Sequence, residues 1–241
     1  MLGQEAVADK GSETTAIPVL LERLAAGGGL KGTLVSIDAI ATNATIATAI
    51  KAAGADYLLA VKANQPTLRA EVESFFCDAP AEEIQTASDT DKGHGRIEQR
   101  TVSVSHAVDW IDSERRFPGE LRLPGVQTIV RVSARAELAD RSRFETRYYI
   151  SSAKLTAERA ALAVRAHWAI ENSLHWTLDV IFADDQARLR KGHGAKNMAV
   201  VRHFAINLLR AVDDKKSIKR RRKIAAWNGE FLARILGLAP R

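Results

Sequence analysis

Two apolar segments that flank one helix-type segment constrain the fold of this chain more than any other feature. Residues 33–37 (TLVSI) and 57–61 (YLLAV) are rich in β-branched and aliphatic side chains, and residues 41–53 between them are rich in alanine, isoleucine and threonine. Strand–helix–strand units with short loops are typical of parallel strands covered by helices. A second helix is predicted from Pro66 to about Cys77, because proline favours the first turn of a helix. The pattern predicts an α/β layer.

The segments before this layer are predicted as a strand and a helix. Residues 2–8 form a weak strand pattern. Ser12 or Thr14 could cap a helix that has Pro18 near its first turn. The glycines at positions 27–29 are expected to end this helix.

An acidic residue, Asp38, directly follows the strand predicted at residues 33–37. In open α/β sheets, ligands gather outside the carboxyl ends of the strands. Asp38 could therefore belong to a ligand site, or it could cap the next helix. Lys62, Asn64 and Gln65 follow the second strand at the same sheet edge. They could contact phosphate or could cap their own loop, and both alternatives stay open.

Three later segments show the partial alternation of β-strands. They are residues 97–105, 128–134 and 144–151, and we interpret them as an antiparallel β insertion. Residues 78–95, which precede them, are predicted as a loop or boundary. Four polar residues alternate around the start of the first strand: His94, Arg96, Glu98 and Arg100. They share one face, which is either functional or simply solvated.

The segment from His167 to Val180 (HWAIENSLHWTLDV) is predicted to lie in a helix that begins near Thr156. Helical spacing places His167, Glu171 and His175 at successive i, i+4 positions. A glutamate among tryptophans, histidines and an asparagine has two interpretations. Either it is a satisfied polar group of an amphipathic helix, or it is a carboxylate presented to a metal-dependent site.

The C-terminal part combines amphipathic helices with a basic run. Residues 197–211 are predicted as a helix with five residues on its apolar side: Val201, Phe204, Ala205, Leu208 and Leu209. Residues 227–236 are predicted as a short terminal helix. Between them, residues 215–223 hold seven basic side chains in nine positions. This run either binds the DNA backbone or is a solvated tail.

Composition narrows the classes of protein. The 241 residues are 46% hydrophobic and 27% charged, which permits a globular core. The formal charge of +6 favours a polyanionic partner. The single cysteine excludes an intramolecular disulfide and a cysteine zinc site. There is no signal-peptide pattern at the start and no apolar run of ~18 residues, so a soluble intracellular protein is predicted.

Several motifs occur in the order found in one protein family. They are VSIDA, LLAVKANQPTL, GHGRIEQR, HWAIENSLHWTLDV and NMAVVRHFAINLLR. In these motifs the chain resembles, over about residues 2–210, the bacterial insertion-sequence transposases of the ISAs-one type. These are also called H-repeat-associated proteins and belong to the DDE superfamily.

The resemblance implies a ribonuclease-H-like core in which three carboxylates hold two divalent metal ions, Mg²⁺ or Mn²⁺. Asp38 matches the second acid of the family and Glu171 the third. Two hard cations ~4 Å apart would bind the scissile phosphate and activate the attacking oxygen. His167, Asn172 and His175 are expected to orient Glu171 or a water molecule. DNA-binding roles are expected for Lys62, Asn64, Gln65, Arg96, Lys219, Arg220, Arg221, Arg222 and Lys223.

The chain departs from the pattern of the superfamily in two respects. The tyrosine, arginine and lysine that accompany the glutamate elsewhere are replaced by Val164, His167 and Leu178, as in the ISAs-one subgroup. The family's first acid would lie upstream of residue 2. We therefore expect an N-terminally truncated, inactive or impaired copy that lacks the first two core strands. The strand at residues 33–37 is then expected to have an open edge or to pair abnormally with residues 2–8. Asp38 and Glu171 are expected to lie close together.

The expected fold is α/β, with a partial ribonuclease-H-like core, an antiparallel β insertion and a C-terminal helical segment. Four parts are predicted: the partial core at 1–92, the insertion at 93–153, helices that complete the core at 154–212 and a basic tail at 213–241.

The predicted function is DNA strand cleavage and transfer by a cytoplasmic, nucleoid-associated bacterial protein. Element-end and target DNA are the expected partners, with self-association or a full-length transposase as further partners. One alternative is a non-catalytic remnant that binds DNA or a transposase. Another is an unrelated metal hydrolase with His167, Glu171 and His175 as ligands.

Overall fold

The chain divides into two compact units in a computed structural model. The first unit comprises residues 2–167 and the second residues 168–241. The structure describes residues 4, 5, 7, 13–93, 96–112, 120–137, 141–189 and 191–238. Helix α5 (Ala157–Ile170) begins in the first unit, and the boundary between the units falls within it.

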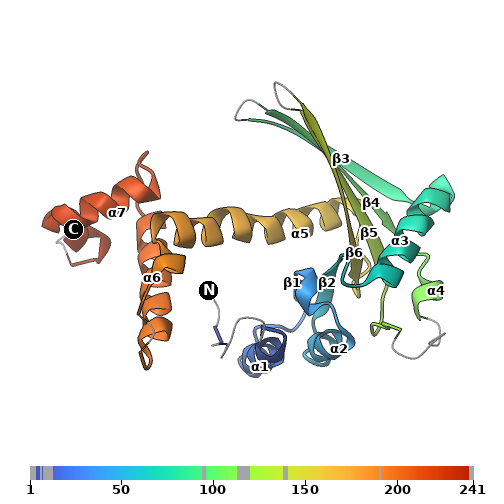
Figure 1. The fold of residues 1–241 in the computed structure, drawn as a ribbon, viewed down its shortest axis with the longest axis horizontal. Helices are drawn as coiled ribbons and strands as arrows, with labels where there is room; N and C mark the ends of the chain where they lie inside the picture. Colours follow the sequence, from blue (N-terminus) through green and yellow to red (C-terminus); the bar gives the residue numbers. More distant parts are fainter. Residues whose placement is uncertain are drawn as a thin grey trace. The chain divides into compact units, whose positions relative to one another are not determined.

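A single mixed sheet forms the first unit (Figure 1). Its strands are β1 (Leu34–Ile37), β2 (Asp56–Val61), β3 (Gln85–Gly93), β4 (Arg96–Ser105), β5 (Thr128–Glu137) and β6 (Ser142–Ser151). The six strands are ordered β1-β2-β6-β5-β4-β3. Only β1 and β2 pair in parallel, and the other neighbours are antiparallel. The mixed α/β class predicted from the sequence is therefore confirmed.

Five strands lie where the sequence predicted them, but the sixth was missed. The prediction of a loop at residues 78–95 is wrong, because β3 forms a long hairpin with β4. Polar side chains face each other across this hairpin, so β3 lacks the alternation of apolar and polar residues by which strands are predicted. For example, Ser88 Oγ lies 3.1 Å from Thr101 Oγ1. Alternating polar residues can thus form a strand when its partner supplies matching polar groups.

The antiparallel strands continue the same sheet as the parallel pair. Strand β6 pairs with β2 along Leu58–Val61, and two serines fix this junction. Ser151 Oγ donates to the Tyr57 carbonyl at 2.6 Å, and Ser152 Oγ accepts from the Tyr57 N–H at 3.0 Å. The division into four parts predicted from the sequence stays a prediction.

Helices cover the sheet and end at identifiable signals. In the first unit they are α1 (Glu13–Ala26), α2 (Ala44–Ala52), α3 (Pro66–Asp78), the short α4 (Asp109–Asp112) and the start of α5. Asn43 caps α2 by accepting from the Ile46 N–H at 2.9 Å. Thr156 caps α5 by accepting from the Arg159 N–H at 3.3 Å, as predicted. Gly28 ends α1 with a φ of 72°, a conformation that glycine adopts without strain.

The core of the first unit lies between the sheet and helices α1–α3. Its fully buried side chains include Ile46, Ile50, Tyr57, Leu59, Val72, Ile129 and Ile150. Each large apolar side chain buried in this way contributes roughly 1.5–3 kcal/mol. This core holds β2, which is buried along most of its length, against helices α2 and α3.

Strand β1 is an edge strand, since it pairs only with β2 among the described residues. This agrees with the expected open edge, and the alternative of abnormal pairing with residues 2–8 stays a prediction. The strand predicted at residues 2–8 lies mostly outside the described residues, and Gln4, Glu5 and Val7 carry no strand structure. Ser12, a candidate cap, and His94 also lie outside the described residues.

In the second unit, the helical segment that starts as α5 widens into two π-helical turns, Glu171–His175 and Thr177–Ile181. Ser173 Oγ donates to the Ala169 carbonyl, and Thr177 Oγ1 donates to the Ser173 carbonyl. Such bonds compete with the regular i→i−4 ladder and favour a local change of helix type. π-Turns are rare and are frequently found at functional sites.

Three more helices complete the second unit: α6 (Gly194–Arg210), α7 (Ile218–Trp227) and α8 (Gly229–Ile235). The predicted apolar side of α6 is only partly correct. Leu209 is buried, but Val201 and Phe204 are 56% and 59% exposed, and the second buried side chain is Ile206. Among the described residues, no helix combines the length and hydropathy that crossing a membrane would require.

The basic run at residues 215–223 is largely helical. Ser217 caps α7 by accepting from the Arg220 N–H at 3.3 Å. Arg221 is only 8% exposed. Its Nε donates to Asp214 Oδ1 at 2.8 Å and its Nη1 donates to the Leu209 carbonyl at 2.7 Å. Arg221 therefore joins the end of α6 to the start of α7.

We expect Arg221→Met to destabilise the α6–α7 pair by about 2 kcal/mol, because it leaves buried acceptors without their charged donor. Amide hydrogen exchange in these two helices should become roughly thirtyfold faster, with amides of the first unit unchanged. Arg220→Met is the matched control, since Arg220 is exposed. Equal exchange rates in the two variants would contradict a structural role for Arg221.

Candidate functional site

Asp38 and Lys62 meet at the carboxyl ends of the two parallel strands. Asp38 follows β1 and Lys62 follows β2, and the register pairs Ile37 with Leu59. Lys62 Nζ lies 2.7 Å from Asp38 Oδ1, with side-chain exposures of 53% and 54%. The ion pair is therefore formed at the sheet edge where the sequence predicted a ligand site.

The surroundings of Asp38 favour its ionised form. Partial burial alone would raise the pKa of Asp38. The Lys62 ammonium and the Ala39 backbone N–H oppose this effect and hold the pKa below its ordinary value. Asn43, rather than Asp38, caps the following helix α2. The structure thus gives Asp38 the properties of an accessible carboxylate.

His167 lies near the Asp38–Lys62 pair through its contact with Ser36, a residue that the sequence analysis did not single out. Its Nδ1 lies 3.1 Å from Ser36 Oγ. Ser36 is two positions before Asp38 in sequence, so both side chains leave this extended segment on the same side. A serine inside an otherwise apolar strand was the available signal. The predicted role of His167, orienting Glu171, stays a prediction beside this observed contact.

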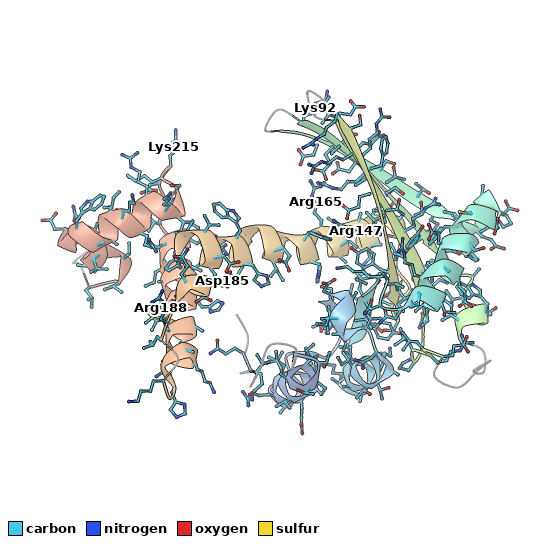
Figure 2. All side chains as sticks on the ribbon, viewed as in Figure 1. Lys92, Arg147, Arg165, Asp185, Arg188 and Lys215 are labelled. Carbon is cyan, nitrogen blue, oxygen red and sulfur yellow. The ribbon has the colours of Figure 1, made fainter. Side chains whose placement is uncertain are left out.

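Arg165, in the second half of α5, connects this helix to the sheet (Figure 2). Its Nη1 lies 2.6 Å from Asp89 Oδ2 and its Nη2 lies 3.3 Å from Asp91 Oδ2. Both acids belong to β3, the strand that was predicted as a loop. His167 is two residues beyond Arg165 on the same helix, so α5 contacts β3 through Arg165 and β1 through His167.

Asn64 and Gln65 connect the two loops at this edge. Asn64 Nδ2 donates to the Ala39 carbonyl at 2.8 Å, and Gln65 Nε2 donates to the Thr42 carbonyl at 2.6 Å. These bonds support the loop-holding alternative, and the predicted phosphate contacts stay a prediction. Gln65 Oε1 is buried without a hydrogen-bond partner among the described residues.

Glu171 lies in the second unit, in the first π-helical turn. His175 Nδ1 lies 3.2 Å from Glu171 Oε2, so the predicted i, i+4 neighbours do meet. Both side chains are about half exposed, and the side chain of Asn172 is outside the described part. Since Asp38 and Glu171 belong to different units, their sharing of a site stays a prediction.

The chemistry of Asp38 fits a ligand of a divalent metal ion. It is an ionised, accessible carboxylate that already holds a cationic group, and Mg²⁺ prefers such oxygen ligands. A complete ligand set is not assembled in the described part of the chain, which contains no group of three or more His, Cys, Asp or Glu that could hold a metal. The alternative hydrolase site of His167, Glu171 and His175 stays a prediction, because His167 and the other two residues belong to different units.

The remaining predicted DNA-binding residues lie on β4 and α7. Arg96 begins β4, but its side chain is outside the described part, and Glu98 and Arg100 pair at 2.7 Å on the same strand. Four residues of α7 are exposed: Lys219, Arg220, Arg222 and Lys223. The fifth, Arg221, is buried in the contacts described above.

Comparison with known proteins identifies relatives over most of the chain. The family model described as Transposase DDE domain matches residues 1–208. The H repeat-associated putative transposase YhhI of Escherichia coli K12 is 36% identical over 98% of this chain and 62% of its own length. The putative transposase YncI of Escherichia coli O157:H7 is 38% identical over 98% of this chain and 60% of its own. No solved structure matches the chain significantly.

The chain spans about three-fifths of the length of these curated relatives. The family match includes both the strand that precedes Asp38 and the helical segment that carries Glu171. This agrees with the motifs that suggested an insertion-sequence protein. The chain therefore belongs to the family of transposases with a DDE domain.

Proposed function

We propose that this chain acts in DNA transposition by cleaving and joining DNA strands, with Asp38 and Glu171 as catalytic carboxylates on a ribonuclease-H-like core. The observation that carries the proposal is the Asp38 site. An ionised carboxylate stands at the carboxyl end of a parallel strand, with Lys62 and the Ser36–His167 pair beside it, in a chain of the transposase family. The parallel pair β1–β2 with its covering helices is consistent with such a core.

Transposase DDE domains generally use divalent metal ions. In this proposal, Asp38 and Glu171 would hold Mg²⁺ or Mn²⁺, which would stabilise the charge that develops on the phosphate oxygens. Asn64 and Gln65 keep the loop after β1 in place and so orient Asp38. His175 orients Glu171 through the contact of its Nδ1 with the carboxylate, and Ser36 orients His167.

DNA is the proposed partner, both as element ends and as target. The exposed cations of α7 present a row of positive charge, and the chain as a whole has a net charge of +6. A helix with such a face binds the phosphate backbone largely without regard to sequence. We also propose that the chain associates with itself or with a full-length transposase. Its proposed location is the bacterial nucleoid in the cytoplasm.

A second candidate is a non-catalytic protein that binds DNA or another transposase. The contact between Lys62 and Asp38 favours it, since the ammonium neutralises the carboxylate that a metal would need. For this reason we propose that cleavage by the 241-residue chain is weak.

Nicking of supercoiled DNA carrying an element end tests the catalytic proposal. We expect weak nicking with Mg²⁺ or Mn²⁺. The nicking rate should fall by more than about a hundredfold in Asp38→Asn and in Glu171→Gln, because losing a metal ligand should lower activity at least as much as losing a group that hydrogen-bonds to a ligand. Glu22→Gln, a change on the exposed side of α1, should leave nicking unchanged.

Three outcomes would contradict parts of this expectation. Nicking that survives both substitutions would exclude these carboxylates from catalysis. DNA binding without any nicking by the unmodified chain would select the non-catalytic candidate. Nicking as fast as that of full-length relatives would overturn the proposal of weak activity.

The contribution of α7 is tested by the salt dependence of DNA binding. Replacing Lys219, Arg220, Arg222 and Lys223 by methionine should reduce the slope of log K against log salt by up to about 3–4 units, because each phosphate contact contributes about 0.9. Arg221 is retained because it holds the helix in place. A control with the same charge loss replaces four exposed cations of the first unit: Lys31, Lys51, Lys154 and Arg159. Equal slopes in the two variants would show that α7 is not the DNA-binding element.

A further inference from the structure

Two lysine–aspartate pairs stand at opposite ends of the parallel strands. Lys51 Nζ lies 2.8 Å from Asp56 Oδ1 at the start of β2, and Lys62 Nζ lies 2.7 Å from Asp38 Oδ1 at the other end. The first pair is part of the sheet junction, because Ser152 Oγ also donates to Asp56 at 2.7 Å. The second pair stands at the edge where ligands of α/β sheets bind. The two pairs are therefore alike in chemistry and different in position.

The Asp38–Lys62 pair is not required to hold its loops. Asn64 and Gln65 already join the loop after β2 to the loop after β1, and Thr42 Oγ1 donates to the Ala60 carbonyl at 2.7 Å. Both partners of the ion pair are more than half exposed, and exposed pairs contribute little to stability. Lys62 can leave Asp38 without loss of the loop structure.

An ammonium and a divalent cation compete for the same carboxylate. Lys62 lies 2.7 Å from Asp38 Oδ1, so a cation bound to this carboxylate would stand close to the ammonium and the two positive charges would repel each other. We propose that Lys62 is the exchangeable counter-ion of Asp38: it neutralises the carboxylate when no metal is bound, and it is released to a DNA phosphate when a divalent cation binds. This inference rests on the proposed function, since it names the ion and the polyanion that use this site.

Release of Lys62 would link metal binding to DNA binding. A cation at Asp38 frees the ammonium, and a phosphate that takes the ammonium leaves Asp38 free for the cation. The two ligands therefore favour each other, and the coupling is the same in both directions. If Lys62 is replaced by an uncharged residue, the metal has no competitor for Asp38. The coupling between metal binding and DNA binding through this residue then disappears.

The first measurement is Mn²⁺ affinity, obtained by calorimetry and by the EPR signal of free Mn²⁺ on the 241-residue chain without DNA. Lys62→Met should bind Mn²⁺ about three- to tenfold more tightly than the unmodified chain, because a repelling charge is removed. Lys62→Arg should keep the original affinity. Lys51→Met removes an equal charge at the other end of the strands and should change nothing. Asp38→Asn should abolish the site.

An unchanged Mn²⁺ affinity in Lys62→Met, or an equal gain in Lys51→Met, would overturn the proposal. So would full binding by Asp38→Asn, which would place the metal elsewhere. Circular dichroism of each variant verifies that the fold is retained. This titration contains neither DNA nor cleavage, so the proposed strand cleavage can fail while the ion exchange stands, and the reverse is also possible.

The second measurement is the coupling between the two ligands. A short DNA duplex is titrated with and without Mn²⁺ at constant ionic strength. In the unmodified chain and in Lys51→Met, Mn²⁺ should tighten DNA binding by the same factor. In Lys62→Met this factor should fall toward one. A factor that is unaffected by Lys62→Met would show that the lysine does not pass from Asp38 to phosphate.

Discussion

The pairing of β2 with β6 is the interaction on which the first unit depends. Among the strands of the described residues, β2 alone has a parallel neighbour on one side and an antiparallel neighbour on the other. Ser151 and Ser152 bond to both backbone groups of Tyr57 and so hold the register of this junction. Residues 57–61 of β2 are all buried, so a shift of one residue would exchange the side chains that pack on its two covered faces. The junction unites two strand types in one sheet.

The candidate site is a consequence of this sheet and of one helix laid against it. The parallel pair brings Asp38 and Lys62 to the same edge, and β3, at the far side of the sheet, supplies the acids that bind Arg165 of α5. The helix then places His167 beside Ser36. The site thus uses residues from both ends of the strand order, although its central carboxylate follows an edge strand.

In the second unit, neighbouring arginines of the basic run differ in their surroundings. Within the basic run, Arg221 points to the end of α6 and to Asp214, whereas its neighbours on α7 are exposed. Backbone carbonyls at the end of α6 need donors, and a buried guanidinium with several N–H groups satisfies them well. A run of basic residues therefore divides into a buried arginine that joins two helices and exposed residues on α7.

The sequence by itself determined the strands β1 and β2, helices α2 and α3 between and after them, and the position of Asp38 at a strand end. These features follow from local periodicity, caps and glycine or proline signals, which act over a few residues. It also determined the family, through motifs in order. Only the tertiary structure decided that residues 85–93 form a strand, that Lys62 neutralises Asp38, that His167 binds Ser36 and that Arg221 is buried. The contacts of Lys62 and of His167 depend on partners far from them in the chain, and Ser36 and His167 are separated by 131 residues. Local sequence patterns do not show which distant group will satisfy a polar side chain.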